Sequence, residues 1–433
     1  MRIYIKNGLC VDAEKIVRKD LLLENENEHG IGIIRENEID KTDLVIDADN
    51  KIIFPGFVNS HTHIAMSVFR NYADDMLLHE WLEKKIWPLE SKLDKEIIYH
   101  ASLVSIIEML RSGTTLFNDM YGFCDSIADA VKKIGIRAII GYGMIDNFDE
   151  DKRLKELRQA ENYRNYISEM KNKLIDFSYC PHAIYTCSKE LILEAKKLAT
   201  LNNSFFHMHA SETRKEVLDS KKKYGKTPIE ILNELKVLDK KTLLAHCCFV
   251  TLKEIKLLSQ SNVNVSHCII SNMKLANGEI APIHEMDSNN VNITLGTDGP
   301  ASNNSLNIIE TAKIASIAQK NFKWNAEIVN AKKTFDFLTV NGYKAFNKKG
   351  GLLKNGYLAD LIIVDYKKAN TLPFANPYAM AIYSMNIDNI ESVIVNGNLI
   401  IYDDYFVNID EQKELESFNK KALDFIQKNS INC

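Results

Sequence analysis

Two histidine pairs in the chain have the spacing of a metal-chelating motif. His61 and His63 end the run PGFVNSHTH, and His207 and His209 end the run SFFHMH. Side chains two residues apart on a strand point to the same face, so each pair can direct both imidazoles toward one point. Neutral imidazole is the commonest metal ligand in proteins. The pairs therefore predict a metal site, provided that other ligands end neighbouring strands.

Further metal-type side chains follow other short apolar runs. His246 ends KTLLAH, His267 ends VNVSH, and Asp298 follows NITLGT. Three imidazoles and one carboxylate around an open position suit a divalent ion such as zinc, which lowers the pKa of its bound water to about 7. Spacing alone leaves open which histidine of the pair in SFFHMH is the ligand. Glu212 favours His209, because it lies three residues further on and can transfer protons beside the ion.

These side chains need a scaffold that brings the ends of several strands together. Eight short apolar runs alternate with longer helical patterns, which is the pattern of a (β/α)8 barrel with catalytic groups at the carboxyl ends of its strands. The predicted strands are KIIFPGFVNS, GTTLFND, IRAIIGYG, LIDFSYC, SFFHMH, KTLLAH, VNVSH and NITLGT. The helical stretches between them include residues 96–111, 155–172, 188–202 and 305–320.

Short β-segments bracket this region. MRIYIKNGLCVD and IESVIVNGNLIIYDD alternate around Asn7-Gly8 and Asn396-Gly397, which predicts two β-hairpins, and ADLIIVD adds a strand. We therefore expect an α/β fold with two parts. Residues 53–349 would form a metal-dependent (β/α)8 TIM-type barrel, and both chain termini, residues 1–52 and 350–433, would form a small β-sandwich domain that ends in a helix.

The composition favours an enzyme acting on a small molecule. The chain has 54 basic and 58 acidic residues and a formal net charge of -4, so it has no basic field to attract nucleic acid. Its eight cysteines form no Cys-x-x-Cys pair, which fits reduced thiols in a cytoplasmic protein. No apolar run approaches the length of a membrane span. We expect a cytoplasmic protein with no nucleic-acid or membrane partner.

Five motifs together resemble the amidohydrolase superfamily, in particular its single-metal deaminase branch: PGFVNSHTH, HASE, LLAHC, SHCIISNMKLANG and LGTDGPASNNSLN. The stretch HTHIAMSVFRNYADDMLLHEWLEKKIWPLE is similar to the 5'-methylthioadenosine / S-adenosylhomocysteine deaminase group, whose relatives include triazine chlorohydrolases and guanine deaminases. The resemblance implies one divalent ion, Zn2+, and no lysine follows Leu174 to bridge a second ion. The implied metal ligands are His61, His63, His209 and Asp298.

The same resemblance implies roles in catalysis and an adenine nucleoside as the substrate. Glu212 would be the proton shuttle, His246 would hydrogen-bond the activated water, and Asp298 would help move a proton to the leaving group. The reaction would be hydrolytic deamination at adenine C6, giving the inosine analogue and ammonia. Glu90 would hold the ribose hydroxyls, and His182 and Glu212 would contact the nucleoside.

The resemblance also bears on the 5' tail of the substrate. Arg153 matches one of two arginines that suit the carboxylate of an amino-acid tail, whereas Tyr142 stands at the position of the other. A phenol supplies no fixed positive charge. This departure favours methylthioadenosine or adenosine over S-adenosylhomocysteine.

Two other functions are compatible with the sequence. The same site could displace a leaving group from a bare heterocycle such as guanine or a triazine, and Glu90 would then be dispensable. A non-catalytic amidohydrolase-like assembly protein needs no ligand set, whereas this chain has a complete one. Trp81 and Met66 fit either the pocket wall or the core, and His267 fits either a brace of the pocket or a substrate contact. The family resemblance further suggests a homo-oligomer.

Overall fold

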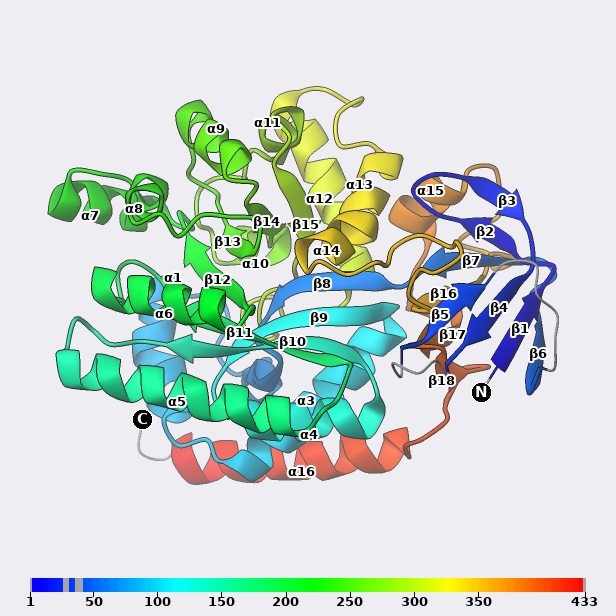
Figure 1. Cartoon of the computed structure of the whole chain (residues 1–433), viewed down its shortest axis with the longest axis horizontal. Helices are drawn as coiled ribbons and strands as arrows, with labels where there is room; N and C mark the ends of the chain where they lie inside the picture. The colour runs from blue at the N-terminus through cyan, green and yellow to red at the C-terminus, as the bar shows by residue number, and fades with distance from the viewer. Residues whose placement is uncertain (1, 26–30, 36–41, 431–433) are drawn as a thin grey trace.

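An eight-stranded parallel barrel forms the centre of the molecule (Figure 1). The computed structural model describes residues 2–25, 31–35 and 42–430. The barrel strands are β8 (Phe57–Thr62), β9 (Thr114–Tyr121), β10 (Arg137–Met144), β11 (Ile175–Pro181), β12 (Phe205–Ala210), β13 (Thr242–His246), β14 (Asn264–His267) and β15 (Asn292–Leu295). They pair in sequence order, and the Asp298 N–H donates to the His61 carbonyl at 3.0 Å where the last strand meets the first. The predicted TIM-type barrel is confirmed.

Helices surround the barrel, and polar caps set where they begin. Asp149 accepts a hydrogen bond from the Lys152 N–H, so the helix predicted from residue 155 already begins at Glu150. Asn307 caps the helix predicted from residue 305, which begins at Ile308. The longer helices are α3 (Lys95–Arg111), α4 (Cys124–Ile134), α5 (Glu150–Glu169), α6 (Lys189–Leu201), α7 (Arg214–Tyr224), α8 (Pro228–Glu234), α9 (Leu252–Gln260), α12 (Ile308–Lys323), α13 (Ala331–Leu338) and α16 (Glu411–Ser430).

Shorter helical segments lie between these elements and near the barrel mouth. They are η1 (Ile64–Phe69), α1 (Leu78–Trp81), η2 (Leu82–Ile86), α2 (Trp87–Glu90), α10 (Ile269–Lys274), α11 (Ile283–Ser288), α14 (Val340–Ala345), α15 (Pro377–Ala379), η3 (Met380–Ser384) and η4 (Ile387–Asn389). The C-terminal helix α16 runs along the barrel beside α3, where Glu411 accepts hydrogen bonds from Arg111 (Figure 1). The predicted closing helix is therefore present.

Both ends of the chain build a β-sandwich beside the barrel. A four-stranded sheet has the order β5-β4-β1-β6, and a seven-stranded sheet has the order β19-β18-β17-β16-β7-β2-β3. Ile3 and Ile5 of the first sheet share a buried core with Ile53 and Leu361 of the second. The strands are β1 (Arg2–Lys6), β2 (Leu9–Val11), β3 (Ile16–Arg18), β4 (Leu21–Glu24), β5 (Ile33–Arg35), β6 (Leu44–Asp47), β7 (Lys51–Pro55), β16 (Leu361–Asp365), β17 (Ile390–Val395), β18 (Asn398–Tyr402) and β19 (Tyr405–Phe406).

The structure corrects one of the two predicted hairpins. The strands around Asn396-Gly397, β17 and β18, pair antiparallel as predicted. The strands around Asn7-Gly8 do not pair with each other, because β1 pairs with β4 and β6 whereas β2 pairs with β3 and β7. The chain crosses here from one sheet to the other, and a Cβ on Gly8 would lie 2.4 Å from Ile53 Cδ1 in the core between them.

The run KIIFPGFVNS, expected as one strand, is two strands that belong to different sheets. β7 joins the seven-stranded sheet and β8 begins the barrel. Gly56 separates them, and a Cβ there would meet Thr115 Oγ1 at 2.0 Å, so only glycine fits this close approach. The change from sandwich to barrel falls at this residue. The domain limits at residues 53 and 349 stay a prediction.

A buried ion pair joins the sandwich to the barrel. Arg137, at the start of β10, donates from Nε and Nη2 to the two oxygens of Asp360 at 2.8 and 2.9 Å. Asp360 precedes β16 and also accepts the Asn396 N–H at 2.7 Å. Both members of the pair are 2% exposed. Each charge is therefore compensated where water cannot reach it.

Replacing Arg137 with methionine should lower the free energy of unfolding by about 3–5 kcal/mol, because the Asp360 charge then stays buried without its partner. Chemical denaturation followed by circular dichroism measures the change. Lys95→Ala is the matched control, since it removes an ion pair with Asp125 whose lysine is 68% exposed. It should cost at most about 1 kcal/mol. Equal losses of unfolding free energy in the two variants would show that the buried pair matters no more to stability than the exposed one.

The seven cysteines in the described part of the chain are all buried and free. None of the helices within residues 2–25, 31–35 and 42–430 combines the length and the apolar character needed to cross a bilayer.

Candidate active site

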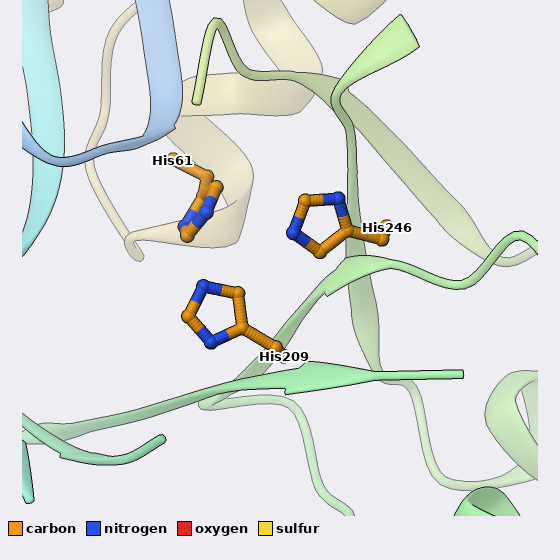
Figure 2. A group of neighbouring side chains, drawn as sticks. All are labelled: His61, His209 and His246. Atoms are coloured by element: carbon orange, nitrogen blue, oxygen red, sulfur yellow. The ribbon is translucent and has the colours of Figure 1, made fainter. Parts of the chain in front are cut away.

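The carboxyl ends of the barrel strands bring the predicted metal ligands into one cluster. His61 Nε2 and His63 Nε2 lie 3.3 and 3.2 Å from Asp298 Oδ1, and His209 Nε2 lies 3.3 Å from His63 Nε2. Figure 2 shows the rings of His61, His209 and His246, which reach from three different strands toward a common centre. The geometry thus assembles residues that are as far as 237 positions apart in the chain, from His61 to Asp298 (298 − 61).

Backbone carbonyls orient two of the imidazole rings. His63 Nδ1 donates to the Met120 carbonyl at 2.5 Å, and His209 Nδ1 donates to the His182 carbonyl at 2.9 Å. A carbonyl oxygen only accepts, so the proton of each neutral ring is on Nδ1 and the Nε2 lone pair faces the cluster. This is the tautomer that a metal ligand requires.

His207 lies behind the cluster. Its Nε2 is 2.9 Å from His61 Nδ1, and its Nδ1 is 3.0 Å from the side-chain nitrogen of Asn118. Burial lowers the pKa of His207 well below its usual range. The ring therefore supports His61 as a neutral hydrogen-bond partner, whereas His209 lies in the cluster itself. Spacing left open which of His207 and His209 would be the metal ligand, and these positions favour His209.

The donor set fits a divalent cation. Ligand atoms of His61, His209 and His246 lie within 4.8 Å of one another, as do those of His61, His63 and Asp298. His61 Nε2 is buried and makes no hydrogen bond of acceptable geometry with any described residue. Imidazole nitrogens with one carboxylate are ligands that suit zinc. The unpartnered nitrogen at the centre of this set supports a bound ion there.

His246 differs from the other rings of the cluster. Its Nδ1 lies 2.9 Å from the side-chain nitrogen of Asn272, which donates to it, so the neutral ring carries its proton on Nε2. That Nε2 lies 3.8 Å from Glu212 Oε2. Glu212 Oε1 in turn accepts a hydrogen bond from Asn277 at 3.1 Å. The arrangement suits His246 as a hydrogen-bond donor beside Glu212.

The charge of Asp298 controls the electrostatics of the cluster. Burial opposes that charge, but the imidazoles of His61 and His63 beside it hold the pKa of Asp298 well below its usual range. Burial lowers the pKa of His61 to about 3. Burial also disfavours the charged form of His63, yet Asp298 outweighs it and raises the pKa of His63 to about 9. Ser271 and Ser302 donate to Asp298 Oδ2 at 2.5 and 2.9 Å, which leaves Oδ1 for the cluster.

A cavity of about 560 Å³ opens above the cluster. Glu90 lines it and accepts a hydrogen bond from Tyr121 Oη at 2.6 Å, and burial raises the pKa of Glu90. His182 lines it as well, with a pKa that burial lowers to about 3. Trp81 and Met66 contact both the cavity and the hydrophobic core, so the two alternatives considered for them are not exclusive.

Two predicted residues lie outside this cavity. Arg153 is not among its lining residues, and its guanidinium lies 3.4 Å from Glu150 and 3.8 Å from Glu194. Among the described residues, Lys152 is the one lysine or arginine that lines the cavity. Adjacent residues on a helix point about 100° apart, which explains why the neighbour takes this place. His267 is buried, does not line the cavity, and has no hydrogen-bond partner for its ring nitrogens among the described residues.

Several polar contacts of the site were not found from the sequence. Ser271, Asn272 and Asn277 all come from the segment SHCIISNMKLANG, and Ser302 comes from LGTDGPASNNSLN. Both segments are among the five motifs of the sequence analysis, so the polar residues within them could have been proposed as site residues. The partners of Ser271, Asn272 and Asn277 are 26 to 65 residues away in the chain, which local spacing does not reveal.

The barrel, the cavity and the histidine–aspartate cluster are arranged as in hydrolases of the (β/α)8 class that bind a metal ion at the carboxyl ends of the strands. The chain matches the Amidohydrolase family over residues 52–400 and belongs to that family.

Individual relatives have narrower names. A 5'-deoxyadenosine deaminase of Methanocaldococcus jannaschii is 44% identical over 92% of this chain and 94% of its own length. A 5-methylthioadenosine/S-adenosylhomocysteine deaminase of Pyrococcus horikoshii is 37% identical over 96% of this chain and 99% of its own length. The crystal structure of an adenosine deaminase from Xanthomonas campestris with bound zinc superimposes with a TM-score of 0.91 at 27% identity, covering 99% of this chain and 98% of that one.

Zinc binding through His63 should release about one proton at about pH 7.5, because the raised pKa of His63 keeps its ring protonated there and an imidazole must be neutral to bind a metal. The apparent affinity should rise by about tenfold per pH unit up to about pH 9 and then level off. Calorimetry in buffers of different ionisation enthalpy counts the proton. A zinc affinity that does not change with pH in this range would show that His63 does not lose a proton when zinc binds.

Proposed function

We propose that the protein deaminates adenine nucleosides hydrolytically at C6, with 5'-methylthioadenosine, S-adenosylhomocysteine, adenosine and 5'-deoxyadenosine as the candidate substrates. The names of relatives at 44% and 37% identity support this class of substrate. The observation that carries the proposal is that one cavity is lined by His63, His209 and Asp298 of the histidine–aspartate cluster and by the carboxylates of Glu212 and Glu90. Such a cavity can hold the base at the cluster and the ribose at the second carboxylate.

One divalent ion, Zn2+ by our proposal, would be held by His61, His63, His209 and Asp298. When bound, the ion would activate water for attack at neutral pH. Glu212 would take the proton of that water and deliver it to the ring nitrogen, a contribution of about 10²–10⁴-fold. Asn277 fixes one oxygen of Glu212 and leaves the other toward His246, which would orient the water. Asp298 would help to pass a proton to the departing ammonia.

Glu90 would recognise the ribose. Tyr121 donates to Glu90 Oε1, so Oε2 remains to accept from the two ribose hydroxyls. His182 is held by Thr186, whose hydroxyl lies 2.8 Å from Nδ1, and would present Nε2 to the nucleoside. A ribose anchor of this kind favours a nucleoside over the bare heterocycles that guanine deaminases and triazine hydrolases use. The complete cluster disfavours a non-catalytic assembly role.

The part of the cavity lining formed by Tyr142 and Glu156 favours an uncharged 5' tail. Tyr142 Oη donates to Glu156 Oε2 at 2.9 Å, and both residues line the cavity. The position that could have carried an arginine therefore presents a phenol and a carboxylate instead. Lys152 is four residues from Glu156 on α5 and partly offsets its charge. An amino-acid carboxylate finds one cation here rather than two, which supports methylthioadenosine or adenosine as the preferred substrates.

We further infer that the enzyme works in the cytoplasm as a homo-oligomer. The buried free thiols support a reducing compartment, and the oligomer rests on the family resemblance.

The proposal predicts ammonia release by the zinc-loaded protein from each of the adenine nucleosides, tested side by side with guanine. Methylthioadenosine and adenosine should give higher kcat/KM values than S-adenosylhomocysteine, because the tail end of the cavity lacks the second cation. Coupled ammonia detection measures the rates. Turnover of guanine alone, or of none of these compounds by metal-loaded protein, would overturn the nucleoside proposal.

Glu90→Ala should lower kcat/KM for the nucleosides by about 10–100-fold, since the ribose loses its charged hydrogen-bond acceptor. Steady-state kinetics with adenosine provides the measurement. Glu80→Ala is the matched control, because Glu80 lies on the same segment but has a side chain that is 54% exposed. Nucleoside turnover that survives the loss of Glu90 would remove the ribose assignment.

A further inference from the structure

The loop that carries Glu212 has an unusual backbone. It follows β12 directly, and Ser211 adopts a left-handed conformation with φ 51°. This conformation is costly for a residue with a side chain and persists only where surrounding contacts enforce it. The Phe249 N–H donates to the Ser211 carbonyl at 2.9 Å, which holds one side of the turn. The donors on the other side are the N–H groups of Ser211 and Glu212.

Both of these N–H groups are bound by one buried carboxylate. Ser211 N–H donates to Glu216 Oε1 at 3.1 Å, and Glu212 N–H donates to Glu216 Oε2 at 2.7 Å. Glu216 is 3% exposed and does not line the cavity. Its two oxygens therefore form a fork that fixes two successive peptide groups of the turn. Burial raises the pKa of Glu216 to about 8, so keeping this side chain in place has an electrostatic cost.

The fork differs from an ordinary helix cap. Glu216 is the third residue of α7, and Thr213 caps that helix in the usual way by accepting the Glu216 N–H at 3.1 Å. In α9 the corresponding Glu254 accepts the N–H of its own cap residue, Thr251, at 2.7 Å. Glu216 instead reaches back past Thr213 to the two preceding residues. Its carboxylate thus serves the loop of Glu212 rather than only the end of the helix.

We propose that Glu216 is a positioning residue for the reaction, which holds the backbone of Glu212 so that the Glu212 carboxylate stays between Asn277 and His246. This inference rests on the proposed role of Glu212. Glu212 Oε1 accepts a hydrogen bond from Asn277, whereas Oε2 faces His246 at 3.8 Å and by our proposal reaches the reacting proton. A small displacement of its Cα would move that oxygen out of reach, and misplacement by about 1 Å can cost about 10²-fold in rate.

The test compares Glu216→Gln with Glu254→Gln in the zinc-loaded enzyme. The amide of the first variant has only one acceptor, so one of the two buried N–H groups loses its partner. We expect kcat to fall by about tenfold or more, with KM within about threefold of the parent value and zinc content unchanged. Glu254 is also a buried capping glutamate, 1% exposed, but belongs to a helix outside the cavity. Its variant should keep kcat within about twofold.

A double-mutant cycle shows whether Glu216 acts through Glu212. In a Glu212→Gln background, adding Glu216→Gln should lower the residual kcat by no more than about twofold, because the group being positioned is already inactive. A full additive loss would overturn the inference, as would a Glu216→Gln enzyme with the kcat of the parent. If Glu212→Gln alone keeps normal turnover, the proposed role of Glu212 fails instead. Should Glu216→Gln not fold, Glu216→Asp, with the same oxygens drawn back by one methylene group, takes its place under the same expectations.

Discussion

The buried carboxylate of Asp298 connects the closure of the barrel with the chemistry of the site. The backbone N–H of Asp298 donates to the His61 carbonyl where β15 meets β8. Asp298 Oδ1 lies 3.3 Å from His61 Nε2 and 3.2 Å from His63 Nε2. Two serine hydroxyls hold its other oxygen. The residue after the last strand therefore brings an anion to the histidines of the first strand, and a cation bound in the cluster would compensate this buried charge.

Left-handed backbone conformations occur at several strand ends that carry functional side chains. Ser211 after β12, His246 at the end of β13 and Asp298 after β15 have φ values of 51°, 73° and 63°. Each turn redirects the chain sharply as it leaves the barrel, so that a side chain next to it can point into the cavity. Conformations of this kind concentrate where the surrounding structure over-determines them, as at ligand sites. The rigid barrel supplies that surrounding structure here.

The sequence predicted the barrel and the candidate ligands because both depend on local patterns. Short apolar runs that end in histidine or aspartate identify the buried strands and the side chains at their ends together. The Asn7-Gly8 prediction failed because a turn signal does not specify which sheet each flanking strand joins. The sequence also could not predict which of the neighbouring residues Lys152 and Arg153 lines the cavity. Adjacent side chains on a helix point in different directions, and Lys152 is the one that lines it. The backbone contacts of Glu216 could not be predicted, because a glutamate near a helix start has the pattern of an ordinary cap.

The charges of the cavity bear on the kind of nucleoside derivative that it accepts. In the part of the chain that the structure describes, the carboxylates lining the cavity are Glu90, Glu156, Glu212 and Asp298, and Lys152 is the one lysine or arginine. Burial raises the pKa values of Glu90 and Glu156, which reduces their charge but creates no positive site. The charge of a bound divalent ion would be balanced by Asp298 and Glu212, beside which the adenine base would lie by our proposal. A phosphate on the ribose would therefore meet carboxylates and a phenol with a single ammonium group, so the same electrostatics that accommodate a nucleoside disfavour a nucleotide.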